Sequence, residues 1–139
     1  RGVGLWQLRY VDGHTFQPDP AKSEAQNRGA YLVEGPGHCG ECHTPRGFDG
    51  GPIAAKALAG GPNPEGKGRI PNITPDADGI GDWSEDDIVT ALTTGMTPTG
   101  DSFGRTMGAV QENLARLAPS DVAAIAAYLK TVPPVAGRR

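Results

Sequence analysis

The feature that most constrains this chain is the segment 38–43, His-Cys-Gly-Glu-Cys-His, which holds the only two cysteines among the 139 residues. It contains the pattern C-x-x-C-H. Two intervening residues bring two thiols to positions where they can add across the vinyl groups on one edge of a porphyrin, and the histidine that follows reaches the iron. The motif therefore predicts one covalently attached haem at Cys39 and Cys42, with His43 as an axial ligand of the iron.

Three other interpretations of the cysteine pair compete with this one. A disulfide between Cys39 and Cys42 would close a very small loop and would restrict the unfolded chain little. A zinc site needs four ligands, and without a second C-x-x-C pair it would have to use His14, His38 and His43. A thioredoxin-like redox pair is expected near a βαβ pattern, which the flanking sequence lacks. The haem interpretation explains the pattern best.

The second axial position of the iron has several candidates. Met96 and Met107 are the only methionines, and a thioether ligand raises the haem potential, which suits an electron carrier. We favour Met107, because a loop in its region can cross the distal haem face before the final helix. Core packing is the alternative for Met107, since it shares helical spacing with Val110. His14 is a further candidate, whereas His38 is tethered beside the attachment point.

The composition favours a small core surrounded by loops. Glycine and proline account for 21 and 13 residues, and aromatic residues make up only 6%. The length suits one domain, in which a porphyrin would supply apolar volume. We therefore predict an all-α fold, with three to five short helices and long loops wrapped around one haem. An irregular N-terminal arm is expected over residues 1–22 and the monohaem domain over residues 23–139.

Local signals place the helices. Ser23 and Gln26 have the form of a capping box. Ser84 is a strong N-cap residue, flanked by Trp83 and Ile88 as a hydrophobic staple. Glycine and proline are dense over residues 44–81, which predicts a long ordered loop, and no convincing strand pair is visible. We expect helices over residues 25–34, 84–94, 107–117 and about 119–130.

Charge and hydropathy exclude some classes of partner. The 13 basic and 16 acidic residues are mixed along the chain, with a net charge of -3. Without a basic stripe that follows a phosphate backbone, no nucleic-acid partner is expected. No stretch approaches the roughly 20 apolar residues that cross a bilayer, so no transmembrane segment is expected. The start, Arg1-Gly2-Val3-Gly4, is neither an initiator methionine nor a signal peptide, which indicates a mature or excised piece.

Several stretches resemble segments of one protein family. The chain resembles class I cytochrome c domains, and more closely the haem domains in cytochrome subunits of bacterial periplasmic dehydrogenases. The C-x-x-C-H motif is specific for haem attachment, and the other stretches indicate the subgroup. Such subunits usually carry three haem domains and a membrane anchor, whereas this chain has one motif. The resembling stretches are residues 27–32, 38–46, 71–75, 79–84 and 124–129.

The resemblance implies one helix crossing and one ligand. In that family the first and last helices cross at a glycine and aromatic residues, which implies that Gly29 packs near Tyr128. The family also places its methionine ligand a little before the last helix, in a segment shaped like residues 107–114. This supports Met107 independently of its spacing.

The resemblance also implies contacts to the rest of the haem. Trp83 and Arg46 are candidates for hydrogen bonds to the propionates, with ordinary packing or surface positions as the alternative. The loop around Asn72 and Ile73 is expected to cover one haem face.

The predicted function follows from the ligands. If His43 and a methionine fill both axial positions, no site is open to a substrate, which implies a carrier of single electrons rather than an enzyme. The resemblance implies that this carrier is periplasmic, because the family's haem attachment occurs on the periplasmic side in bacteria. Its partners would be a redox donor and acceptor, such as a dehydrogenase and a terminal oxidase or another cytochrome. The alternative is an electron-transfer subunit or domain of a membrane-associated dehydrogenase complex. A haem enzyme or sensor with an open axial site would require that neither methionine binds iron.

Overall fold

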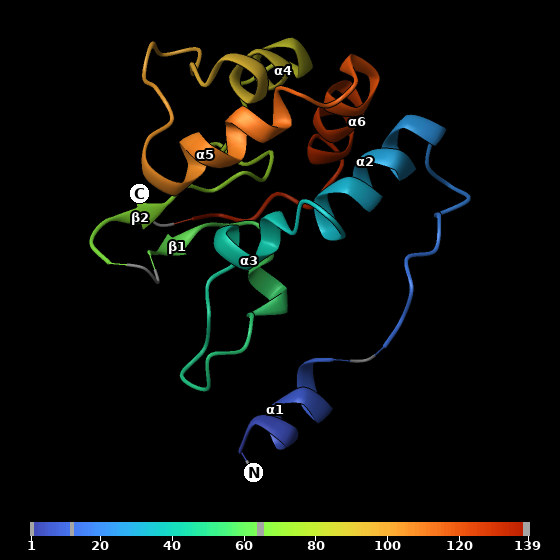
Figure 1. Ribbon diagram of the computed structural model, residues 1–139, viewed down its shortest axis with the longest axis vertical. Coiled ribbons are helices and arrows are strands. Elements are labelled where there is room, and N and C mark those ends of the chain that lie inside the picture. Colours follow the sequence, from blue (N-terminus) through green and yellow to red (C-terminus); the bar gives the residue numbers. More distant parts are fainter. Residues whose placement is uncertain (1, 12, 64–65, 138–139) are drawn as a thin grey trace.

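The computed structural model describes residues 2–11, 13–63 and 66–137. Within these ranges the chain is mostly helical with long loops, as predicted (Figure 1). The described part has six α-helices rather than three to five, because α1 and the short α3 were not anticipated. The elements are α1 (Gly2–Tyr10), α2 (Glu24–Glu34), α3 (Cys39–His43), the 3-10 helix η1 (Ala54–Lys56), β1 (Gly61–Pro62), β2 (Arg69–Ile70), α4 (Glu85–Thr94), α5 (Arg105–Leu114) and α6 (Pro119–Leu129).

The crossing of α2 and α6 is the centre of the fold. A Cβ atom added to Gly29 would lie 1.9 Å from the Ala124 carbonyl oxygen and 2.6 Å from Cβ of Tyr128. Only glycine lets the two backbones approach so closely, and the predicted contact between Gly29 and Tyr128 is confirmed. The Arg28 guanidinium clamps the crossing with two hydrogen bonds to the Asp121 carboxylate, at 2.8 and 2.9 Å.

One hydrophobic core joins α2, α4 and α6. Each helix buries one apolar face, in keeping with the helical spacing of its hydrophobic residues. The Tyr128 hydroxyl, at the edge of this core, donates a hydrogen bond to the Glu34 carboxylate. The buried core residues are Ala30, Leu32, Val33, Leu58, Ile80, Ile88, Leu92, Val122, Ile125, Ala126, Tyr128, Leu129 and Val132.

Helix ends follow the sequence signals. The Ser23 hydroxyl accepts a hydrogen bond from the Gln26 backbone, and the Gln26 side chain accepts one in return, so the predicted capping box is present. Ser84 caps α4 in the same way with Asp87, whose pKa is lowered by the hydrogen bonds that Ser84 donates. Gly95 ends α4 in the left-handed conformation, with φ of 76°.

The long loop between α3 and α4 is ordered by hydrogen bonds to the backbone. The Gly60 N–H donates to the His43 carbonyl at 2.7 Å, and the Ile73 N–H donates to the Leu58 carbonyl at 2.9 Å. The loop contains η1 and the antiparallel pair of β1 and β2. The expectation of no strand pair was wrong, because two-residue strands rich in glycine and proline show no alternation of apolar and polar residues.

The N-terminal region is not the irregular arm that was predicted, since residues 2–10 form α1. Apolar residues lie on all sides of α1, so the sequence shows no helical period. The helix is held by Tyr10, whose hydroxyl donates to Asp49 Oδ2 at 2.6 Å and whose ring lies against Gly51. Figure 1 shows α1 at the opposite end of the molecule from α4, joined to α2 by an extended segment. No helix in the described part is long and apolar enough to cross a membrane.

Candidate haem site

Helix α3 presents the C-x-x-C-H motif at the start of the long loop. His38 takes a left-handed conformation, with φ of 32°, which turns the chain from the end of α2 into α3. Cys39 and Cys42 are both free thiols and are three residues apart, so they lie on the same face of the helix. Cys39 is half-buried, which raises the pKa of its thiol, whereas Cys42 is exposed. The pair is therefore available for covalent attachment along one edge of the helix.

His43 is prepared as a metal ligand by one backbone hydrogen bond. Its ring is buried, and Nδ1 lies 2.9 Å from the Pro71 carbonyl oxygen. A carbonyl can only accept, so Nδ1 carries the proton and Nε2 keeps its lone pair. Burial lowers the pKa of His43, although the bond to Pro71 opposes this effect. The imidazole is thus neutral and oriented, which is the state that binds a metal.

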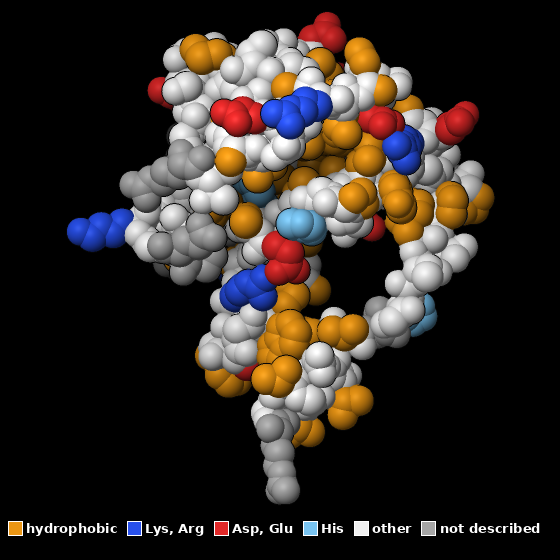
Figure 2. All heavy atoms as spheres, viewed as in Figure 1, with side chains coloured by type: hydrophobic (Ala, Val, Ile, Leu, Met, Phe, Trp, Pro, Cys, Tyr) orange, Lys and Arg blue, Asp and Glu red, His pale blue; other side chains and the backbone are white. Residues whose placement is uncertain are grey.

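A hollow with apolar walls lies beside α3. Figure 2 shows this face of the molecule hollowed between α5 and α3, with hydrophobic side chains inside. Partly buried side chains from different elements pack against the hydrophobic core. A flat apolar ring with a ligand on each face fits a hollow that has α3 on one side and α5 on the other. The partly buried residues are Phe16, Cys39, Ile73, Trp83, Val89, Met107, Leu114 and Leu117.

The two methionines occupy different environments. Met107 lies in the first turn of α5 and packs against the core. Met96 follows α4, where its side chain is 45% exposed and its backbone pairs with Ser102. The Gln111 amide donates to the Thr93 carbonyl at 2.6 Å and so fixes α5 against the end of α4. Met107 is thus the more buried of the two methionines, and its role as second axial ligand stays a prediction.

Three further predicted residues lie in the loop before α4. Ile73 and Trp83 are partly buried, and both pack against the core. Asn72 is buried, but its amide nitrogen donates to the Val135 carbonyl at 2.7 Å. Its oxygen accepts from the backbone and the hydroxyl of Thr74, both at 2.8 Å. The Asn72 side chain therefore ties the loop to the C-terminal segment, which sequence reasoning did not anticipate.

Arg46 and the two remaining histidines are exposed. The Arg46 guanidinium pairs with the Glu41 carboxylate and donates to the Gly50 carbonyl at 2.8 Å. It is thereby engaged at the loop that follows α3, and its role toward a propionate stays a prediction. His14 and His38 are both exposed.

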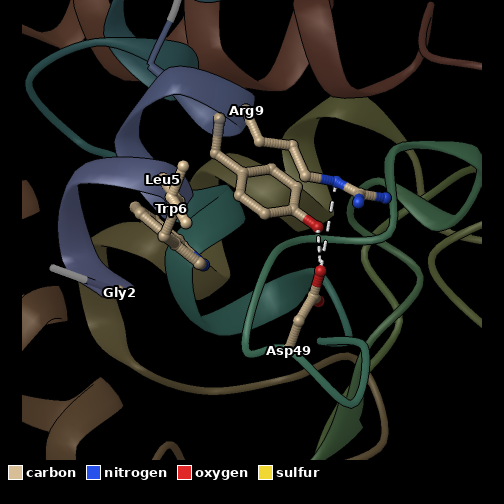
Figure 3. Close-up of a pocket in the computed structure, with 6 residues that line it drawn as sticks. Gly2, Leu5, Trp6, Arg9 and Asp49 are labelled. Atoms are coloured by element: carbon tan, nitrogen blue, oxygen red, sulfur yellow. Dashed lines mark hydrogen bonds and ion pairs between the residues drawn. The ribbon is translucent and has the colours of Figure 1, made fainter.

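Two other cavities contain none of the predicted ligands. One of about 360 Å³ lies under α1, where Figure 3 shows Arg9 pointing to Asp49 across 4.0 Å. The other, of about 650 Å³, is lined in part by Gly40, Glu41 and Thr44, which lie on the face of α3 opposite Cys39. Among residues 2–11, 13–63 and 66–137, no three His, Cys, Asp or Glu side chains gather as a metal site.

Sequence reasoning missed the partner of His43. Pro71 contributes only its backbone carbonyl. Every residue has such a carbonyl, so the residue type gives no signal for this contact. The stretch 71–75 did resemble the family, so the segment was singled out although the contact was not.

Comparison with known proteins decides the family. The model of the cytochrome c family matches residues 26–133. The chain belongs to the cytochrome c family. This confirms the resemblance and the fold class that the sequence predicted, and it supports electron transfer by haem.

Curated relatives of this cytochrome are longer proteins. A diheme cytochrome c-type protein from Cereibacter sphaeroides is 48% identical over 133 residues, which cover 96% of this chain and 44% of that protein. The cytochrome c subunit of a quinone alcohol dehydrogenase from Gluconobacter oxydans is 40% identical, over 96% of this chain and 29% of that subunit. The fructose dehydrogenase cytochrome subunit of Gluconobacter japonicus is 38% identical, over 94% and 27%. The chain thus spans less than half the length of each.

Proposed function

We propose that this cytochrome carries single electrons through one haem bound covalently at Cys39 and Cys42, with His43 and Met107 as axial ligands. The observation that carries the proposal is the buried, neutral His43, held by Pro71 on the α3 side of an apolar hollow. The family match supports the cofactor. When bound, the haem supplies Fe(II)/Fe(III) exchange.

The residues of the chain would allow electron exchange at the iron without allowing a substrate to react there. The two thiols would fix the edge of the ring, and the hydrogen bond from His43 Nδ1 would keep Nε2 aimed at the metal. The Met107 sulfur would fill the remaining axial position and raise the potential. Apolar walls would exclude water. With both axial positions filled, the domain would act as a carrier rather than as an enzyme.

The biological setting is also part of the proposal. The relatives named as cytochrome subunits of alcohol and fructose dehydrogenases support a dehydrogenase as electron donor. A terminal oxidase or another cytochrome would be the acceptor, through small and transient interfaces.

We place the domain in the periplasm, where bacteria attach c-type haem. Electron transfer within a dehydrogenase complex is the second candidate, which a stable partner chain would establish. The diheme relative leaves room for a further haem outside this chain.

Met107→Ala is expected to abolish the far-red charge-transfer band that sulfur ligation gives to ferric haem. Met96→Ala is expected to keep it, because Met96 is exposed and lies outside the core. The measurement is the visible spectrum of the purified oxidised protein, followed by reduction. The carrier proposal would be contradicted if the parent protein lacked the band and its reduced form bound carbon monoxide. That result would indicate a haem sensor or enzyme with an open axial position.

Ile73→Ala is expected to lower the free energy of unfolding by roughly 1–3 kcal/mol and to lower the haem potential. The truncated side chain would leave a gap at the edge of the core, where Ile73 now packs. Denaturant titration and potentiometry measure the two effects. Val110→Ala, at a 40% exposed position on α5, is the control. An unchanged melting temperature and potential for Ile73→Ala would show that this residue does not cover the haem.

A further inference from the structure

Lys130 makes an unusual set of contacts at the end of α6. Its ammonium donates to the carbonyl oxygens of Ile80 at 3.3 Å, Gly81 at 3.0 Å and Trp83 at 2.8 Å. An ammonium has three donors, and here all three are directed to one stretch of backbone. Sequence reasoning gave Lys130 no role beyond the last residue of a helix.

The segment 80–83 needs such a partner. The N–H groups of Ile80 and Gly81 are already bound to the carbonyls of Thr74 and Asp76, both at 3.0 Å. The carbonyls of the segment lie outside any regular helix or sheet. That of Ile80 also accepts from the Trp83 N–H at 3.2 Å, and Lys130 binds the carbonyls of Ile80, Gly81 and Trp83 together. Holding a partly buried lysine in one conformation costs side-chain entropy, which the three hydrogen bonds offset.

The same segment packs against the hydrophobic core. Ile80 is buried in the core, and Trp83 is partly buried and packs against it. Ser84, the next residue, caps α4, so the segment leads directly into that helix. Lys130, which follows α6, thus holds the backbone that carries the Trp83 indole.

We propose that Lys130 is a positioning residue of the haem pocket: it holds the 80–83 backbone so that Trp83 lies against the haem, and this placement favours the reduced iron. The proposal rests on the proposed function. It concerns the placement of Trp83 and requires no change in the axial ligands.

The test uses the haem-loaded protein in a Trp6→Phe background, where Trp83 is the only tryptophan. Haem quenches the fluorescence of a nearby indole by energy transfer, which falls steeply with distance. Lys130→Met is expected to raise the Trp83 fluorescence at least twofold and to lower the equilibrium constant for reduction by a fixed donor at least threefold. Lys130→Arg, which keeps the charge and donors, is expected to recover most of both losses.

Lys22→Met is the matched control, since Lys22 also contacts α6, with its ammonium 5.1 Å from the centre of the Tyr128 ring. It is expected to change neither quantity. If Lys130→Met does not fold, Lys130→Gln takes its place with the same two expectations. The inference would be overturned if the Lys130 variants changed neither the Trp83 fluorescence nor the equilibrium constant for reduction. It would also be overturned if Lys22→Met changed both quantities equally. Either outcome would leave the proposed function standing. Absence of haem from the Trp6→Phe parent would overturn the proposed function as well.

Discussion

Replacing both Cys39 and Cys42 by alanine is expected to leave the polypeptide with no covalently bound haem. These are the only cysteines of the chain, so no other thiol can form a thioether. The axial ligands His43 and Met107 would then hold the iron by reversible bonds only, and the haem would leave when the protein is denatured. Haem staining after denaturing electrophoresis measures the covalent fraction directly, and we expect complete loss.

The matched control for this experiment is His38→Ala. His38 adjoins Cys39 in sequence but is exposed and has no place in the proposed ligand set. Covalent haem is expected to persist in this variant. Each single cysteine variant would keep one thioether link, with a shifted absorption band of the reduced haem. Haem staining that survives the double replacement would show that attachment occurs through another residue.

Gly29→Ala is expected to lower the free energy of unfolding by about 2 kcal/mol. The new methyl group would lie 1.9 Å from the Ala124 carbonyl oxygen, a backbone atom that cannot turn aside as a side chain can. Overpacking of this kind typically costs about 1–3 kcal/mol or more, which outweighs the gain of about 1 kcal/mol from replacing a helical glycine. Thermal unfolding should show a melting temperature lower by roughly 5–10 °C.

Gly108→Ala makes the same chemical change within α5 and serves as the control. The nearest atom to its added Cβ would be the Phe103 carbonyl oxygen at 3.7 Å, which is ordinary contact. Because alanine favours the helix more than glycine does and no clash opposes it here, the free energy of unfolding is expected to rise by up to about 1 kcal/mol. Equal stability of the two variants would mean that α2 and α6 can separate at their crossing without cost.

The sequence predicted best what depends on neighbouring residues. The capping box of Ser23 and Gln26 involves residues three positions apart and was predicted correctly. Ser84 was predicted as an N-cap, and the structure adds its reciprocal partner, Asp87. The C-x-x-C-H motif is similarly local. The crossing at Gly29 joins residues that are far apart in the sequence. The contact between Gly29 and Tyr128 was predicted from the family resemblance, because helical periodicity does not show which helices meet.

Contacts between distant segments account for what was missed. Helix α1 has no apolar period, and its attachment depends on Asp49 and Gly51, which no local pattern connects to Tyr10. Pro71 and Lys130 act through backbone carbonyls, which every residue possesses. Asn72 was expected near the haem because of its segment, but its partners in Thr74 and at residue 135 emerge only from the folded chain.

The crossing of α2 and α6 also sets an order of events in time. The ion pair between Arg28 and Asp121 joins residues 93 positions apart, and the core cannot close until both helices exist. Contacts of such long range slow folding, since the intervening chain must lose its freedom before they form. The C-x-x-C-H segment lies near the beginning of that interval. If haem is attached after export, as the proposed periplasmic setting requires, the attachment enzymes would reach these thiols most easily while α6 has not yet closed the core.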